Sequence, residues 1–414
     1  MGKAVNSSKG TGSKFMGWMD ARLPVTKMWK DHMAEYYAPK NFNFWYFFGS
    51  LAMLVLVNQL LTGIWLTMHY KPDAAQAFGV VEYIMRDVPW GWLIRYLHTT
   101  GASAFFIVVY LHMFRGLMYG SYKKPRELIW VFGMIIYVAL MAEAFMGYVL
   151  PWGNMSYWGA KVITQLFGVI PYVGDTLLEW IRGDYLISDA TLNRFFALHV
   201  VAVPIVLLVL VFLHIAALHT VGSNNPDGIE IKKYKDENGV PLDGIPFHPY
   251  YSVKDIFGVG MFMLIFLFIV FVKPDLGGLF LEHDNFTPAN PMVTPEHIKP
   301  VWYFTPFYAM LKAVPDPLGG MIIMFGAIIM LFFLPWLDRS EVKSIRYRLL
   351  PFKLALSAFV LSFLILGWLG MQSGSTIQGY MTIVCTIIYF SYFVFIFFYS
   401  KNEKHKPIPE RVTH

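Results

Sequence analysis

Cysteine and charged residues are both scarce in this sequence. The 414 residues include one cysteine, Cys385, and 14% charged residues, against 56% hydrophobic residues. A single cysteine excludes a disulfide within the chain, and without a Cys-x-x-Cys-His motif no c-type haem can be attached covalently. Soluble domains carry about 25% charged residues, so the composition argues against a soluble fold. We expect Cys385 to be an inert packing residue.

Long apolar runs are abundant and predict an all-α membrane protein. Eight runs have transmembrane length, so we expect eight transmembrane helices over these ranges: Phe44–His69, Leu97–Met118, Leu128–Val149, Phe195–Leu218, Ile256–Val272, Leu318–Trp336, Leu354–Leu369 and Tyr380–Tyr399. The first 40 residues are basic and polar, without the apolar core of a cleaved signal peptide. We expect no cleaved leader, and we expect residues 1–15 to be disordered.

The basic residues are distributed according to the predicted spans. Of the 33 Lys and Arg residues, 22 fall on the side of the two termini, seven fall on the opposite side, and four lie at span ends. The positive-inside rule therefore places both termini in the cytoplasm and the long loops 150–193 and 273–317 outside. Because the net charge of +6 follows the membrane topology, we expect no nucleic-acid partner.

Four of the twelve histidines lie well inside apolar spans, His98 and His112 in the second and His199 and His214 in the fourth. Ionisable residues at such depth are costly and usually mark function, although a single one could be a hydrogen-bonded packing residue. The 14-residue step from His98 to His112 returns to within roughly 40° of the same helix face and rises about 21 Å. The 15-residue step from His199 to His214 returns to within roughly 60° and rises about 22 Å. Pro204 could alter the winding in the fourth span. Since both spans run inward, we expect His98 to meet His199 near the outer surface and His112 to meet His214 near the inner surface.

Each histidine pair suits a haem better than a zinc ion. Zinc usually needs four protein ligands, and no carboxylate or thiolate accompanies either pair, whereas a haem needs only axial ligands. Gly49 and Gly63 in the first span, and Gly133 and Gly147 in the third, repeat the 14-residue histidine interval. Glycine allows close approach of a macrocycle, although one such pair alone indicates helix packing. We therefore predict that the first four helices form a four-helix bundle with two haems, whose irons lie roughly 20 Å apart.

Arginines lie three residues outward of the second-span histidines. Arg95 and Arg115 can reach haem propionates from these positions. Arg194 could do the same at the outer site, with interfacial anchoring as an equal alternative. With both axial positions filled, the predicted haems suit electron transfer. A transporter with histidine proton relays would predict internal repeats and broken helices, which the sequence does not clearly contain; a third alternative is a di-haem membrane anchor for a dehydrogenase.

Over about residues 30–400 the sequence resembles the cytochrome b subunit of bacterial quinol–cytochrome c oxidoreductase, the cytochrome bc complex. The resemblance is carried by GWLIRYLH (91–98), AFMGYVLPWG (144–153), RFFALH (194–199), HTVGSNNPDG (219–228), PFHPYYSVKD (246–255) and TPEHIKPVWYFTPFYAML (294–311). Eight spans in one chain imply the fused form rather than the split plastid type. The 15-residue step from His199 to His214 is similar to the plastid type and leaves the haem tilt undetermined.

The resemblance, together with the predicted spans, implies five regions. They are a cytoplasmic N-terminal tail with a surface helix (1–40), the di-haem bundle (41–222) with outer amphipathic helices (156–182), a cytoplasmic connector (223–251), a C-terminal four-helix region (252–400) with an outer quinol-site loop (273–317), and a cytoplasmic tail (401–414).

The activity implied by the resemblance is quinol oxidation at the outer face of the bacterial inner membrane. One electron passes to a Rieske iron–sulfur subunit and then to a c-type cytochrome subunit. The other crosses through an outer, low-potential haem b (His98, His199) and an inner, high-potential haem b (His112, His214) to reduce quinone at the inner face. The resemblance also implies a homodimeric complex in contact with membrane lipids, which contributes to the proton-motive force.

Two quinone sites follow from residues that match the family. The outer site would use Phe145, Tyr148, Gly159, Val301, Trp302, Tyr303 and Tyr308. The inner site would use His219, Ser223, Lys254 and Asp255. On composition alone, the aromatic residues would suit an interfacial belt, and His219 would suit a helix cap.

The outer loop departs from the family pattern at Val301. The family commonly has Pro-Glu-Trp-Tyr, with the glutamate as a proposed proton acceptor, whereas this chain has Pro300-Val301-Trp302-Tyr303. Quinol oxidation still needs a proton acceptor. We predict that Glu143 in the third span replaces the missing glutamate, with Glu296 as second choice; a structural carboxylate paired with an arginine is the alternative.

Overall fold

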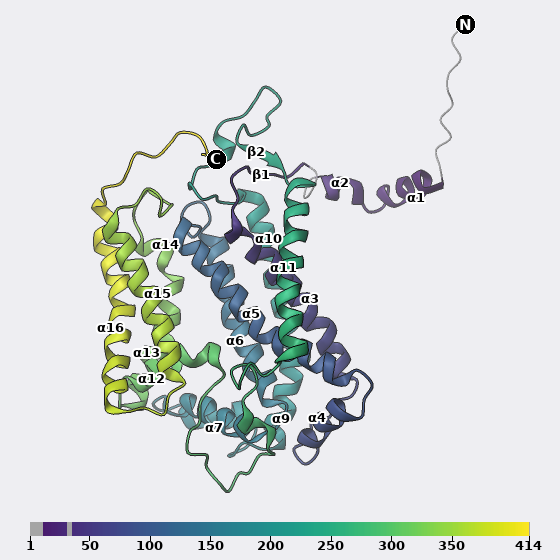
Figure 1. Cartoon of the computed structure of the whole chain (residues 1–414), viewed down its shortest axis with the longest axis vertical. Helices are drawn as coiled ribbons and strands as arrows, with labels where there is room; N and C mark the ends of the chain where they lie inside the picture. The colour runs from purple at the N-terminus through teal and green to yellow at the C-terminus, as the bar shows by residue number, and fades with distance from the viewer. Residues whose placement is uncertain (1–10, 31–34, 414) are drawn as a thin grey trace.

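The computed structural model describes residues 11–30 and 35–413. These residues are mostly helical, because a backbone inside a bilayer must satisfy its hydrogen bonds within its own segment (Figure 1). Within this part of the chain, seven helical segments are long and apolar enough to cross a membrane, so the chain is a multi-pass membrane protein. Their helices are α3 (Phe47–Thr67), α5 (Gly91–Tyr119), α6 (Glu127–Val149), α9 with α10 (Asp189–Ala197 and Val203–Val221), α11 (Tyr250–Val272), α15 (Leu350–Gly370) and α16 (Thr376–Tyr399).

The predicted sixth span, Leu318–Trp336, is divided into two helices. α13 (Pro317–Phe332) has 16 residues and is shorter than the seven segments above. α14 (Leu334–Leu337) follows after a break at Phe333. Pro335 accounts for this break, because proline has no N–H to donate and its ring crowds the carbonyl of the preceding turn.

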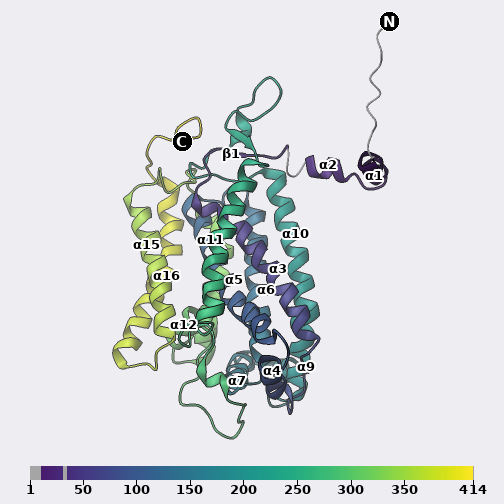
Figure 2. The same cartoon turned by 45° about the vertical axis from the view of Figure 1, so that its right-hand side comes forward.

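The spanning helices form two groups that stay separate in two views (Figures 1 and 2). In the first group α3 packs on α5, α6 packs on α10, and α11 covers α5 and α3. The second group contains α13, α15, α16 and the short helix α12 (Thr305–Lys312), which packs on α13 and α15. A core of buried side chains from both groups joins them, including Phe106, Tyr137, Tyr303 and Tyr389.

The first, third and fifth loops build one layer at the end of the molecule opposite the described termini (Figure 1). This layer contains α4 (Ala77–Arg86), α7 (Asn154–Gly168) and α8 (Gly174–Arg182). The fifth loop is joined to the start of α7, since Gly153 forms a β-bridge with Pro288 and the Asn154 N–H donates to the Thr287 carbonyl. A 3-10 turn at His283–Phe286 lies in this loop, and another at Trp302–Phe304 leads into α12.

The two described ends of the chain lie on the same side of the molecule (Figure 1). Strand β1 (Tyr37–Pro39) pairs antiparallel with β2 (Gly244–Pro246) of the connector between α10 and α11. The Thr413 N–H donates to Asp227 in the same connector. The short helices α1 (Thr11–Asp20) and α2 (Val25–Trp29) precede β1. The expectation of disorder over residues 1–15 is therefore wrong from Thr11 onward, and residues 1–10 lie outside the described part of the chain.

A buried ionic cluster on the terminal side holds the two helix groups together. Arg348 is fully buried and forms ion pairs with Asp338 and Glu403, each at 2.6 Å. Lys123, which follows α5, reaches the same Asp338 at 2.9 Å. Burial opposes ionisation of Asp338, but the positive charges of Lys123 and Arg348 hold its pKa below its usual value.

Candidate functional site

The four span histidines form two facing pairs. The His98 ring on α5 lies 6.2 Å from the His199 ring, centroid to centroid. The His112 and His214 rings lie 6.4 Å apart. The structure therefore brings the histidines together in the pairs that helix geometry predicts, one pair toward each end of the bundle.

A π-helical turn accommodates the extra residue between His199 and His214. Leu198–Ala202 is π-helical, and the Val203 N–H donates to the Leu198 carbonyl five residues earlier. A π turn contains one residue more than an α turn, so a 15-residue step here rotates like a 14-residue step in a regular helix. Pro204 favours the change, because it has no N–H for the carbonyl of the preceding turn. The 15-residue spacing and Pro204 are the two sequence features that together indicate this turn.

Each of the four predicted glycines lies against one of the four histidines. A Cβ atom on Gly63 would lie 3.2 Å from His98 Cε1, and one on Gly147 would collide with the His199 ring. At the other pair, a Cβ on Gly49 would lie 3.5 Å from His112, and one on Gly133 would lie 3.4 Å from His214. In this structure the glycines make room for the imidazole rings, and this close approach holds each ring against a neighbouring helix.

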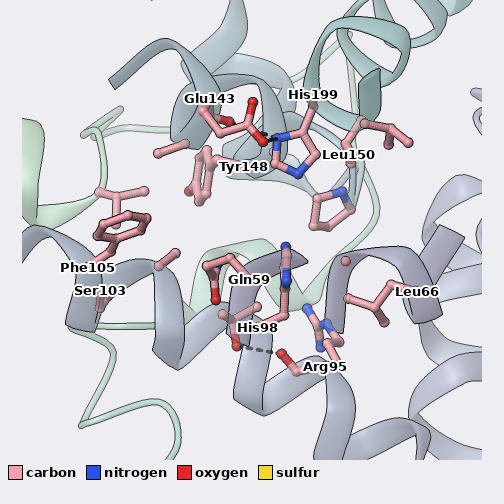
Figure 3. Close-up of a pocket in the computed structure, with 18 of the residues that line it drawn as sticks. Gln59, Leu66, Arg95, His98, Ser103, Phe105, Glu143, Tyr148, Leu150 and His199 are labelled. Atoms are coloured by element: carbon pink, nitrogen blue, oxygen red, sulfur yellow. Dashed lines mark hydrogen bonds and ion pairs between the residues drawn. The ribbon is translucent and has the colours of Figure 1, made fainter. Parts of the chain in front are cut away.

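The outer pair has hydrogen-bond partners that orient its rings, and Figure 3 shows the contact between His199 and Glu143. His98 Nδ1 lies 2.9 Å from the Thr62 hydroxyl. His199 Nδ1 lies 2.9 Å from the Glu143 backbone carbonyl and 3.0 Å from the Glu143 carboxylate. A metal-binding histidine commonly donates its second ring N–H to such a group. Both rings can therefore present Nε2 to a ligand.

These pairs suit a group that brings further ligands of its own. Within residues 11–30 and 35–413, no three His, Cys, Asp or Glu side chains gather as a metal site. Arg115 is near the inner pair, and its buried Nε has no hydrogen-bond partner among the described residues. A buried guanidinium with an open donor fits an anionic group such as a propionate. Facing imidazoles, a glycine against each ring and this arginine together fit a haem.

The outer pair opens into a cavity of about 260 Å³ whose walls are largely apolar (Figure 3). Sequence-predicted residues of both the haem site and the quinol site line it: Gly63, Arg95, His98, Glu143, Gly147, Tyr148, His199, Val301 and Tyr303. One continuous space thus adjoins the outer histidines and the outer loop.

Glu282 is a cavity residue that sequence reasoning missed. Its side chain is 8% exposed, and its carboxylate accepts a hydrogen bond from the Tyr148 hydroxyl. Burial raises the pKa of Glu282, and the bond from Tyr148 partly opposes that rise. By contrast Glu296, the second sequence candidate, is exposed. The sequence feature that could have identified Glu282 is its position directly after the apolar residues Gly278–Leu281 of the fifth loop.

The loop that carries Glu282 is fixed to α7 and to the outer aromatic residues. The Asn285 side chain accepts from the Ser156 N–H at 2.8 Å and donates to the Ser156 hydroxyl at 2.9 Å. Phe280 stacks near Trp302, with ring centroids 6.4 Å apart. Glu282 is therefore held at the cavity by contacts on both sides of it in the chain.

The remaining predicted outer residues surround the cavity without lining it. Trp302 Nε1 donates to Ser103 at 3.1 Å, and the Tyr308 hydroxyl donates to a backbone carbonyl at 2.9 Å. Phe145 packs edge-on against Phe195. Gly159 lies beside Tyr148, where an added Cβ would be 3.7 Å from the tyrosine ring.

Arg194 lies apart from the cavity. Its guanidinium donates to the Trp180 carbonyl near the end of α8 and lies against Gly183, and it is not among the cavity-lining residues. This position fits the interfacial alternative better than a propionate contact. Arg95 does line the cavity, as a propionate ligand would.

Two of the predicted inner quinone residues, His219 and Ser223, contact the same tyrosine, while the other two, Lys254 and Asp255, lie in the first turns of α11. His219 lies 4.6 Å from the Tyr36 ring, and the Tyr36 hydroxyl lies 3.1 Å from the Ser223 hydroxyl. Lys254 lies 4.4 Å from the Tyr250 ring centroid on α11. Asp255, the next residue, is partly buried. Sequence reasoning missed Tyr36, because nothing in the N-terminal segment marks its contact with His219.

The fold and the site define a class of membrane protein in which one helix bundle carries two facing pairs of partly buried histidines. The Cytochrome b/b6/petB family profile matches residues 33–222, and the Cytochrome b(C-terminal)/b6/petD profile matches residues 288–390. The chain belongs to the cytochrome b/b6 family, whose members bind haem b.

Individual relatives agree with this family over nearly the whole chain. Cytochrome b of Allochromatium vinosum is 61% identical over 406 residues, which cover 96% of this chain and 98% of that protein. Cytochrome b of Rhodospirillum rubrum is 50% identical over 402 residues, covering 97% and 96%. A solved structure of a hyperthermophilic respiratory Complex III has a chain with a TM-score of 0.85 and 36% identity, covering 92% of this chain and 98% of that one. The protein is thus a respiratory cytochrome b of the kind found in cytochrome bc complexes.

Proposed function

We propose that the chain spans the bacterial inner membrane eight times, with both termini in the cytoplasm. The seven long helical segments and the shorter α13 support this number. An even number of spans agrees with the described ends on one side of the molecule, and that side carries most of the basic residues.

We propose that two non-covalent b haems lie between α5 and the α9–α10 segment. His98 and His199 would be the axial ligands of the outer haem, and His112 and His214 those of the inner haem. The two facing imidazole pairs, each ring backed by a glycine, are the observation that carries the proposal. When bound, each haem would supply a reversible one-electron carrier. Arg95 and Arg115 would bind propionates.

We propose that quinol is oxidised in the outer cavity. Tyr148, Val301 and Tyr303 would contact the quinone ring, since such rings favour apolar walls with few polar groups. Phe145, Gly159, Trp302 and Tyr308 would support these walls from behind. Of the two electrons released, one would leave through a Rieske subunit to a c-type cytochrome and the other would cross the bundle to the inner side.

The quinol proton requires an acceptor, and Glu282 is the carboxylate that the geometry favours. It is buried, lies in the cavity, and receives a hydrogen bond from Tyr148. Glu143, the acceptor predicted from sequence, lies in the same cavity, but its carboxylate faces His199. We therefore propose Glu282 and Tyr148 as the proton-accepting pair in place of the missing glutamate at Val301.

At the inner side, we propose that His219, Ser223, Lys254 and Asp255 form the quinone-reduction site together with Tyr36. The contacts that join Tyr36 to His219 and Ser223 support this grouping. An imidazole can deliver a proton to reduced quinone near neutral pH. A homodimeric complex with Rieske and c-type cytochrome subunits is proposed from the similarity to a Complex III chain.

A haem analysis of the purified complex tests this function. We expect two haems b for each copy of this chain and quinol-dependent reduction of cytochrome c. A histidine-relay transporter would contain neither haem, so a preparation without b-type absorption would reject the proposal.

A further inference from the structure

We propose that Glu143 is a positioning residue that lowers the redox potential of the outer haem by accepting the Nδ1–H bond of His199. This inference rests on the proposed role of His199 as an axial ligand. It assigns Glu143 a function other than proton acceptance from quinol.

The contact between Glu143 and His199 is made by two oxygens of one residue. The backbone carbonyl lies 2.9 Å and the carboxylate 3.0 Å from Nδ1 (Figure 3). Both side chains are largely buried, at 16% and 15% exposed. The ring also lies tightly against Gly147, one turn further along α6. The carbonyl and the glycine therefore fix the ring orientation, while the carboxylate adds a negative charge.

His112, in the inner pair, has a charged neighbour of the opposite sign. His112 Nδ1 lies 3.3 Å from an amino group of Arg115. At His98, Nδ1 meets the neutral hydroxyl of Thr62, which itself donates to the Asn58 carbonyl at 2.6 Å and so accepts from the ring. A carboxylate therefore contacts a ring nitrogen of the outer pair, and a guanidinium contacts one of the inner pair. Arg95 lines the outer cavity as the counterpart of Arg115, so Glu143 is the charge that distinguishes the outer pair.

This difference favours electron flow from the outer to the inner site. A carboxylate bonded to Nδ1–H makes the imidazole a stronger donor through Nε2, which favours the oxidised state of a bound iron. Reduction adds negative charge, so it is also opposed by a nearby anion and favoured by a nearby cation. Glu143 would lower the outer potential, and Arg115 would raise the inner one.

Potentiometric titration of the assembled complex, followed by absorption of the two b haems, tests the role of Glu143. Glu143→Gln keeps the size and the backbone carbonyl but removes the charge. A charged hydrogen bond is roughly twice as strong as a neutral one. We expect the equilibrium constant for reduction of the outer haem to rise by about tenfold, or about 59 mV for one electron. The inner haem should not shift.

Two further variants complete the test. Glu143→Met removes both the charge and the side-chain acceptor but keeps the backbone carbonyl, so it should raise the outer potential at least as far, with both haems retained. Glu296→Gln, at an exposed carboxylate of the fifth loop that is not among the cavity-lining residues, should leave both potentials unchanged. An unchanged outer potential in Glu143→Gln, or loss of the outer haem from both Glu143 variants, would overturn the proposal. If the outer potential is unchanged in Glu143→Gln but both haems are present, the role of Glu143 is wrong and the proposed function still holds. A wild-type complex without b haems would instead reject the proposed function.

Discussion

The Tyr148 hydroxyl donates a hydrogen bond to the buried carboxylate of Glu282, and this contact joins the third span to the outer loop. In the sequence these residues are far apart, and neither belongs to the Pro-Val-Trp-Tyr segment. Their pairing places a protonatable group in the cavity although Val301 cannot serve as one.

Glu282→Gln should slow quinol oxidation by roughly 10² to 10⁴-fold, the usual contribution of a general base. The basic form must be present to accept a proton, so the wild-type rate should fall as pH drops through the pKa of Glu282. Burial raises that pKa, with smaller opposing effects from Tyr148 and Lys299 and a raising effect from Asp284. The acid limb of the pH–rate profile should therefore lie above the ordinary glutamate range.

Tyr148→Phe should move this acid limb to higher pH, because it removes a bond that lowers the pKa of Glu282. Glu296→Gln is the matched control, since Glu296 is an exposed carboxylate in the same loop. If Glu282→Gln keeps the wild-type rate and pH profile while Glu143→Gln loses activity, Glu143 is the proton acceptor, as the sequence predicts.

The π turn predicts an unusual tolerance to deletion. Removing Val201 together with Pro204→Ala should convert Leu198–Ala202 to regular helix and keep His199 and His214 in register, because the π turn contains one extra residue. Both haems should remain in the absorption spectrum. Inserting one alanine at the same point has no such compensation and should displace His199. If the deletion loses a haem as readily as the insertion, the π turn does not set the register.

The glycines predict graded effects of added methyl groups. Gly147→Ala forces a collision with the His199 ring, whereas the Cβ of Gly49→Ala meets His112 at an ordinary 3.5 Å. Overpacking typically costs about 1–3 kcal/mol. We expect Gly147→Ala to reduce outer-haem occupancy and Gly49→Ala to retain the inner haem, as measured by haem-to-protein ratio. Equal occupancy in the two variants would contradict this packing.

The ionic cluster predicts a stability effect remote from the cavity. Asp338→Asn removes one of the two carboxylates that pair with the fully buried Arg348. It also removes the carboxylate that pairs with Lys123. Removing one partner of a buried pair typically costs about 3–5 kcal/mol, so the thermal midpoint in detergent should fall clearly. Glu82→Gln disrupts the more exposed Arg86 pair and should change stability by less than about 0.5 kcal/mol. Equal midpoints for the two variants would show that the cluster does not join the helix groups.

Sequence reasoning located most of the bundle because bilayer constraints act locally. Apolar length identifies a span, and helix periodicity places His98 and His112 on one face, so the pairing could be predicted without coordinates. Pairings across the fold were harder to predict, because the partners of Tyr148 and His219 depend on loop paths between distant segments. Glu143 was identified as unusual, but its carboxylate faces His199 rather than an arginine. The break at Phe333 was missed because the apolar run continues through Pro335.

The central claim is that the two histidine pairs hold two distinct haems, and selective loss of each haem tests it most directly. Absorption-monitored redox titration of the purified complex should resolve two b-type components in the wild type. His98→Asn should remove the lower-potential component alone, and His112→Asn the higher-potential component alone. A single component in the wild type, or both components retained in either variant, would contradict the account.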